Sequence, residues 1–240
     1  MIINANPNGV EIALLENKKL VELHHEKADA VFAVGDLYLG KVKKLIPGLN
    51  AAFIDVGYEK DAFLHYTDLS PFIRSILKFT QESIHEKSDN IADFSKFKPE
   101  PEIVKTGKIN EVIKGKPEIL VQILKEPIAA KGPRLSCEIS LPGRFIVITP
   151  FNDVIAVSKK IHSADERKRL HKIVESIKPK NFGVIVRTAA EGKNSAELHD
   201  DLAQLIETWR NIQRNLKNVK APAKILSEQE NHQHSSRFIK

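Results

Sequence analysis

Cysteine is almost absent from this chain of 240 residues, in which Cys137 stands alone. A single thiol excludes an internal disulfide and any zinc site built on paired cysteines. Long apolar runs are also missing: nowhere do about 18 apolar residues follow one another, so we expect no membrane span. The first residues, MIINAN, lack a basic region followed by an apolar stretch. We therefore expect no signal peptide and a cytoplasmic protein.

The histidines give no metal site in the sequence. His24 and His25 are neighbours in a strand pattern, where adjacent side chains point to opposite faces. His232 and His234 lie in a polar tail without a third ligand. Because structural zinc sites use about four ligands, we predict no metal-binding residues.

The composition is that of a folded protein with excess positive charge. Apolar residues make up 42% and charged residues 28% of a length that allows one large domain or two small ones. The formal net charge of +6 and the pI near 9.2 suggest a polyanionic partner. A well-solvated basic surface without such a partner would give the same totals, and composition leaves both readings open.

The segment from Gly35 to His65 predicts three consecutive strands of a small barrel. Short apolar strand patterns alternate with turns that contain glycine or proline. Phe53 and Phe63 fall on adjacent strands, beside a strand rich in lysine. An OB-fold barrel binds single-stranded nucleic acid in this way, because bases stack on exposed aromatic rings while cations contact phosphates. A core position is the alternative for both rings, since large apolar side chains are mostly buried.

The motif AAFIDVG followed by AFLH resembles the RNA-binding domain first described in ribosomal protein S-one, in the version found in the ribonuclease E/G family. The resemblance implies an α+β fold. A five-stranded OB-fold β-barrel would span residues 35–141, with a long mobile insertion at about 85–107. Residues 1–34 read as a β-meander and would be part of a ribonuclease-H-like subdomain.

The same resemblance assigns RNA contacts within the barrel. Phe53 and Phe63 fall on the family's RNA-contacting aromatic residues. Lys131 stands where the family has a lysine, and it is the best candidate for a phosphate contact near the end of the barrel. Lys41 and Lys43, on the lysine-rich strand, are the other expected RNA-binding residues.

A small α/β subdomain is predicted over residues 142–220. Strands are expected at 144–148, 154–157 and 182–186. Ser163, three residues before Glu166, forms a capping-box signature that opens a helix. A second, long amphipathic helix follows, and Trp209 is expected in its buried stripe.

The family resemblance continues through this subdomain. It rests on the segments KGPRL from Lys131, ISLPGR from Ile139, SKKI from Ser158 and GVIVRTA from Gly183. In the family, this part senses the 5′-monophosphate end of RNA. By position, Arg187 and Thr188 would hold the phosphate, Gly143 would allow close backbone approach, and Val147 would pack against the terminal nucleotide. The planar guanidinium of arginine can bind two phosphate oxygens at once, which favours this assignment. The alternative is that the Arg-Thr pair lies at the end of an ordinary strand and has no binding role.

Residues 157–180 carry eight lysines and arginines against three acidic residues. This local excess could steer RNA toward the sensor. A solvated helix face explains it equally well, and the sequence leaves the two interpretations open.

Nuclease chemistry in this family lies in a later region, where paired aspartates hold magnesium. Nothing in this chain corresponds to that region or to the family's later cysteine pair. We therefore expect no catalytic residue and no cofactor here, with Mg²⁺ needed only in a complete enzyme. Residues 221–240 resemble the start of the next family segment and then depart into a polar tail.

The resemblance implies a function in RNA processing. The chain would be the RNA-binding, 5′-monophosphate-sensing N-terminal part of an endoribonuclease that cleaves single-stranded RNA, with roles in rRNA maturation and mRNA decay. Single-stranded RNA is the expected partner, and a homo-oligomer is expected for the complete enzyme. The alternative is a stand-alone, non-catalytic RNA-binding or regulatory protein of the OB-fold class.

Overall fold

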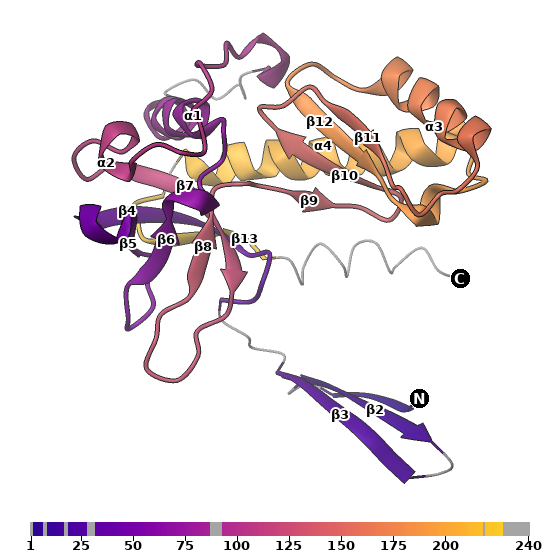
Figure 1. The fold of residues 1–240 in the computed structure, drawn as a ribbon, viewed down its shortest axis with the longest axis horizontal. Helices are drawn as coiled ribbons and strands as arrows, with labels where there is room; N and C mark the ends of the chain where they lie inside the picture. The colour runs from indigo at the N-terminus through magenta and orange to yellow at the C-terminus, as the bar shows by residue number, and fades with distance from the viewer. Residues whose placement is uncertain are drawn as a thin grey trace. The chain divides into compact units, whose positions relative to one another are not determined.

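A computed structural model describes residues 2–6, 9–16, 19–27, 32–86, 93–217 and 219–227. The chain divides into two compact units, residues 1–33 and residues 34–240. The larger unit has an α+β fold that contains two sheets (Figure 1). Within it, the change from the first sheet to the second falls near residue 141, where the sequence predicts a domain boundary.

The smaller unit is the predicted β-meander. Strands β1 (Ile2–Asn6), β2 (Gly9–Glu16) and β3 (Lys19–Lys27) pair in antiparallel order. Apolar side chains are exposed on it, among them Leu20 and Val21. Its membership of a ribonuclease-H-like subdomain stays a prediction.

The first sheet of the larger unit closes into the predicted five-stranded barrel. Its strands are β4 (Leu37–Ile46), β5 (Ala51–Asp55), β6 (Ala62–His65), β7 (Glu118–Lys125) and β8 (Arg134–Ser136). Their order is β4-β5-β6-β8-β7, and pairing of β4 with β7 closes the barrel. Only β6 and β8 are parallel. Ile54 and Leu64 are fully buried inside, and the arrangement is that of an OB-fold.

A sixth strand extends this sheet beyond the sequence prediction. Strand β13 (Ala223–Leu226) pairs antiparallel with the start of β4, in a region expected to belong to the next segment. The Nζ atom of Lys224 lies 2.7 Å from a carboxylate oxygen of the buried Asp36, which fastens this strand to the barrel. The polar tail after residue 227 lies outside the described residues.

The insertion between β6 and β7 is mostly helical at its start. Helix α1 (Ile73–His85) follows β6 closely, and α2 (Ile109–Val112) precedes β7. Among the described residues of the insertion, Phe94 and Ile103 are buried. The side-chain amide of Asn181 donates hydrogen bonds to the carbonyls of Phe94 and Phe97, both at 2.9 Å. The described part of the insertion therefore packs against the second sheet.

The second sheet forms the predicted α/β subdomain. Strands β9 (Leu141–Pro142), β10 (Ile146–Pro150), β11 (Ile155–Val157) and β12 (Phe182–Val186) lie in the order β11-β12-β10-β9. Helix α3 (Ala164–Ile177) connects β11 to β12, and the Ser163 side chain accepts a hydrogen bond from the N–H of Glu166 at its start. Helix α4 (Ser195–Leu216) contacts β10, α1 and β13 (Figure 1).

An aromatic cluster joins the two halves of the larger unit. Trp209 of α4 is buried, as the sequence predicts, and stacks on Phe79 of α1 with ring centroids 5.1 Å apart. Phe94, Phe151 and Phe182 add edge contacts around the indole. Because such pairs bury large apolar areas, this cluster fixes the barrel and the second sheet as one body. Among the described residues, no helix combines the length and the hydropathy of a membrane span.

Candidate nucleic-acid interface

The outer face of the barrel carries a cross-strand row of aromatic and basic side chains. Register places Lys44 opposite Phe53, Phe53 opposite Phe63, and Phe63 opposite Arg134. Paired residues on neighbouring strands lie on the same face of a sheet, so these four side chains follow one another across it. The row runs over β4, β5, β6 and β8.

Phe53 and Phe63 are half-buried, whereas their chain neighbours Ile54 and Leu64 are fully buried. The two rings meet edge to face with centroids 5.8 Å apart. His65 continues the surface, since its ring is nearly parallel to that of Phe63 at 6.4 Å. The rings therefore form a partly exposed aromatic surface outside the core.

The lysines predicted on β4 differ in their surroundings. Lys41 is exposed. The Nζ atom of Lys43 lies 2.7 Å from Asp61 and 3.4 Å from Asp55. The hydrogen bond to Asp61, with the Asp55 carboxylate beside it, raises the pKa of Lys43. These acids offset the charge of Lys43, whereas the exposed Lys44, opposite Phe53, forms no ion pair with a described residue.

Lys131 is exposed in the loop between β7 and β8, close to the start of β6. The N–H of Phe63 donates to the carbonyl of Pro133 at 2.8 Å. A Cβ atom on Gly132 would lie 2.3 Å from the carbonyl oxygen of Asp61, so this loop rests directly on the β5–β6 turn. The structure thus brings Lys131 to the same side of the barrel as the aromatic row.

The loop between Gly143 and Val147, two of the predicted sensor residues, is held by a buried carboxylate that the sequence does not reveal. Asp201 of α4 accepts hydrogen bonds from the backbone N–H groups of Arg144, Phe145 and Ile146, at 3.0, 2.8 and 3.0 Å. A Cβ atom on Gly143 would lie 2.7 Å from both oxygens of this carboxylate. A side chain at position 143 would therefore push this carboxylate away from its three partners.

Arg187 and Gly143 meet at the end of β12. The Arg187 guanidinium donates to the Gly143 carbonyl at 2.6 Å, and the Arg187 backbone N–H donates to the Phe145 carbonyl at 2.8 Å. Arg187 and Thr188 are both exposed. One guanidinium N–H is used in this way, and the remaining donors face no partner among the described residues, so they are available to an anion.

Val147 lies beside this basic group on the open face of the second sheet. It is half-exposed, while the flanking Ile146 and Ile148 are buried on the other face. Register places Val147 next to Ile185, and Ile185 next to Ala156 of β11. Ile185 is 43% exposed. The structure thus adds Ile185, two residues before Arg187, to an apolar surface on which a terminal nucleotide could rest.

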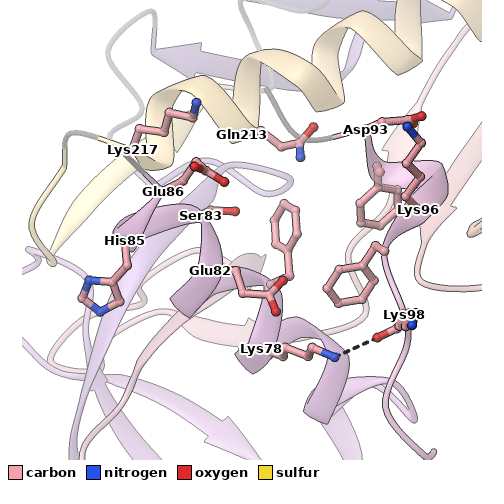
Figure 2. Close-up of a pocket in the computed structure, with 13 residues that line it drawn as sticks. Lys78, Glu82, Ser83, His85, Glu86, Asp93, Lys96, Lys98, Gln213 and Lys217 are labelled. Carbon is pink, nitrogen blue, oxygen red and sulfur yellow. Dashed lines mark hydrogen bonds between the residues drawn. The ribbon is translucent and has the colours of Figure 1, made fainter. Parts of the chain in front are cut away.

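A separate hollow of about 630 Å³ lies between α1, the insertion and α4 (Figure 2). Phe79, Phe94 and Phe97 form its apolar floor. Its rim carries both signs of charge, and one of its lysines, Lys78, donates a hydrogen bond to the Lys98 carbonyl at 3.1 Å (Figure 2). The mixed rim selects no class of ligand, and no predicted site residue lines the hollow.

Within the described parts of the chain, no group of three or more histidine, cysteine, aspartate or glutamate side chains is placed to hold a metal ion. His232 and His234 lie outside those parts. Cys137 is buried, and desolvation raises the pKa of its thiol well above the ordinary range, so it is unreactive.

Comparison with known proteins agrees with the fold. The sequence model described as "Ribonuclease E/G family" matches residues 140–239. Ribonuclease G of Haemophilus influenzae is 34% identical over 228 residues, which cover 95% of this chain and 42% of that protein. Ribonuclease G of Escherichia coli strain K12 is 34% identical over 88% of this chain and 39% of its own length. Ribonuclease E of a Nostoc species is 36% identical over 191 residues.

These similarities extend through both parts of the larger unit. The chain spans about 40% of the length of the curated ribonuclease G relatives that it matches. The family match includes the motif around Arg187, the relatives extend over most of the chain, and the structure has the barrel that the motif around Phe53 predicts. This chain therefore belongs to the ribonuclease E/G family.

Proposed function

We propose that this chain binds single-stranded RNA and senses its 5′-monophosphate end, as the substrate-binding part of an endoribonuclease. The observation that carries the proposal is the position of Arg187. Its guanidinium is exposed and anchored to the Gly143 carbonyl, beside the apolar surface of Val147 and Ile185. A terminal nucleotide needs both an anion site and a surface for its base, and this corner offers the two together.

Phosphate recognition at this corner would follow the geometry of the donors. The free N–H groups of Arg187 can contact two phosphate oxygens at once, and the Thr188 hydroxyl can add a short directional bond. Asp201 already accepts hydrogen bonds from the three N–H groups of the loop behind them, so the anion would depend on the Arg187 and Thr188 side chains.

The barrel would hold the body of the RNA. Bases would stack on Phe53 and Phe63, while Lys44, Lys41 and Lys131 contact phosphates on the same side. Lys43 would contribute less than predicted because Asp61 and Asp55 already bind its ammonium group.

The cleavage step belongs to the complete relatives, whose names describe ribonucleases. In such a protein we expect Mg²⁺ to support the chemistry, and this chain to supply RNA binding and end recognition. Homo-oligomer formation and a cytoplasmic location stay predictions.

The preference of the chain for RNA with a 5′-monophosphate over RNA with a 5′-hydroxyl tests the proposal. Two single-stranded RNAs of one sequence, with a 5′-monophosphate or a 5′-hydroxyl, are titrated into the wild-type chain at fixed salt. A charge-assisted contact is worth about 1.5–3 kcal/mol, so we expect a preference of roughly tenfold or more for the monophosphate. Arg187→Ala should remove the preference. Arg210→Ala, which deletes an exposed arginine paired with Glu207, is the matched control and should retain it.

Equal affinity of the wild-type chain for the two RNAs would refute end sensing. An unchanged preference in Arg187→Ala would show that Arg187 is an ordinary surface arginine. Thr188→Val, which removes the hydroxyl and keeps the shape, should reduce the preference by a smaller factor.

A further inference from the structure

The exposed face of α3 is unusually rich in cations. Arg167, Lys168, His171 and Lys172 lie on it, together with two exposed acidic residues, Asp165 and Glu175. These residues follow the spacing that places side chains on one side of a helix. α3 lies on the outside of the second sheet, away from the barrel (Figure 1).

Other charged residues of the same segment are used in the fold. Arg169 forms two hydrogen bonds of 2.7 Å with Glu166 and a third with the Lys193 carbonyl. Lys178 contacts Asp153 at 2.7 Å. By contrast, Arg167, Lys168 and Lys172 form no ion pair with any described residue. These three exposed cations are therefore available to an external anion.

A groove of about 450 Å³ runs beside these cations, between α3 and β11. Val157 and Ala164 form part of its wall. Among the described strands β11 pairs with β12 alone, so it lies at the edge of this sheet. The groove therefore lies beside the charged ends of basic side chains, the methylene groups that carry them, and the outer edge of a strand.

The groove begins close to the proposed sensor. β11 and β12 are parallel, so both strands end at the same edge of the sheet. The Ser158 N–H donates to the Val186 carbonyl at 2.9 Å, one residue before Arg187. Lys159 and Lys160 follow Ser158 directly and are exposed. Cations thus extend from the edge that carries Arg187 onto α3.

We propose that the α3 face is a second RNA-binding surface, which contacts the sugar–phosphate backbone regardless of base sequence and 5′ end. The proposal rests on RNA binding by this chain, as argued above. RNA is favoured over an acidic peptide or an anionic membrane because RNA bound at the neighbouring sites is already at high effective concentration here. A flexible strand can also pass around the sheet edge from Arg187 to α3.

A charge-removal variant tests this surface without touching the sensor. In the triple variant Arg167→Ala, Lys168→Ala, Lys172→Ala, three phosphate contacts should be lost. Each phosphate contact to a single strand adds about 0.7 to the steepness of log K against log salt. Without three contacts, the magnitude of this slope should decrease by about 2. At about 0.1 M salt, affinity should drop roughly ten- to a hundredfold, and the difference should vanish near 1 M.

The matched control removes three exposed cations from α1 and the insertion: Arg74→Ala, Lys96→Ala, Lys98→Ala. Both variants are measured with a 5′-monophosphate and a 5′-hydroxyl single-stranded RNA of about 20 nucleotides, and helix content is checked by circular dichroism. We expect the α3 variant to bind both RNAs more weakly by the same factor, so that the ratio of the two affinities is unchanged. The control variant should show a smaller loss of affinity.

The outcomes separate the two proposals. End preference with an unchanged salt slope in the α3 variant would overturn the second surface and leave the sensor intact. A reduced slope without end preference in the wild-type chain would overturn the sensor and leave the α3 surface intact. If the wild-type chain binds polyglutamate or phosphatidylserine vesicles through α3, while RNA affinity matches the control, the occupant is not RNA and the inference fails.

Discussion

Replacing Asp201 with asparagine is the sharpest probe of how α4 shapes the sensor loop. In the wild-type chain, one carboxylate oxygen accepts from Arg144 and the other accepts from Phe145 and Ile146. The carbonyl of asparagine can keep two of these bonds, but its NH₂ group then faces the N–H of Arg144. One charge-assisted bond is lost and a buried donor is left unpaired, for which we expect a cost of about 2–4 kcal/mol in the free energy of unfolding.

Urea unfolding measures this cost, and Asp200→Asn is the control. Asp200 lies next to Asp201 on α4, but its side chain is 78% exposed, so its replacement should change stability by less than about 0.5 kcal/mol. Under folding conditions, Asp201→Asn should also lose preference for 5′-monophosphate RNA while 5′-hydroxyl RNA binds as before, because Gly143 and Arg187 lose their fixed geometry.

Two results would refute this reasoning. If Asp201→Asn is as stable as Asp200→Asn, the carboxylate does not hold the loop. If stability falls but end preference is unchanged, the loop does not position Arg187.

The remaining predictions concern the barrel and α3. Phe53→Ala and Phe63→Ala should each weaken single-stranded RNA binding by about 1–3 kcal/mol in titrations, with circular dichroism unchanged; a loss of folding instead would show that the rings serve the core. The Arg169 hydrogen bonds, with a backbone bond from Gly192, lower the pKa of Glu166 to about 2. A lowered carboxyl pKa stabilises the fold above about pH 4.5. We therefore expect urea unfolding to give a constant difference in unfolding free energy between wild type and Glu166→Gln above that pH. The difference should shrink as the pH falls toward 2, and a difference that persists at pH 2 would contradict the ion pair.

Local patterns predict much of this fold. Short strands broken by glycine and proline turns predict the barrel, because a half-buried strand must alternate its faces. They also place Phe53 and Phe63 on adjacent strands. Trp209 is predicted in the core because it lies within an apolar helical stripe, and the structure buries it.

Features that depend on distant contacts are not visible in the sequence. Asp201 follows another aspartate on an amphipathic helix and looks like a solvated residue, yet its partners lie more than fifty residues away. Phe94 lies in a segment with many charges and prolines and no periodicity, but it packs against Trp209. The ion pair of Lys43 depends on a turn that folds Asp61 back over β4. In each case the side chain is stabilised by a neighbour that only the tertiary fold brings close.

A chain of contacts along α4 connects the proposed sensor to the barrel that carries the aromatic row. Asp201, near the start of the helix, holds the sensor loop, and Asn215, near its end, donates to the Ile225 carbonyl of β13 at 2.9 Å. Lys224 then ties β13 to Asp36 beside β4. At about 1.5 Å per residue, the fourteen residues from Asp201 to Asn215 give a rod of about 20 Å. An RNA that reaches both the sensor and the aromatic row must therefore extend between two sites held on one rigid support. Because the second contact is then intramolecular, end recognition and stacking should reinforce each other in unpaired RNA and fail to do so where the 5′ end is base-paired.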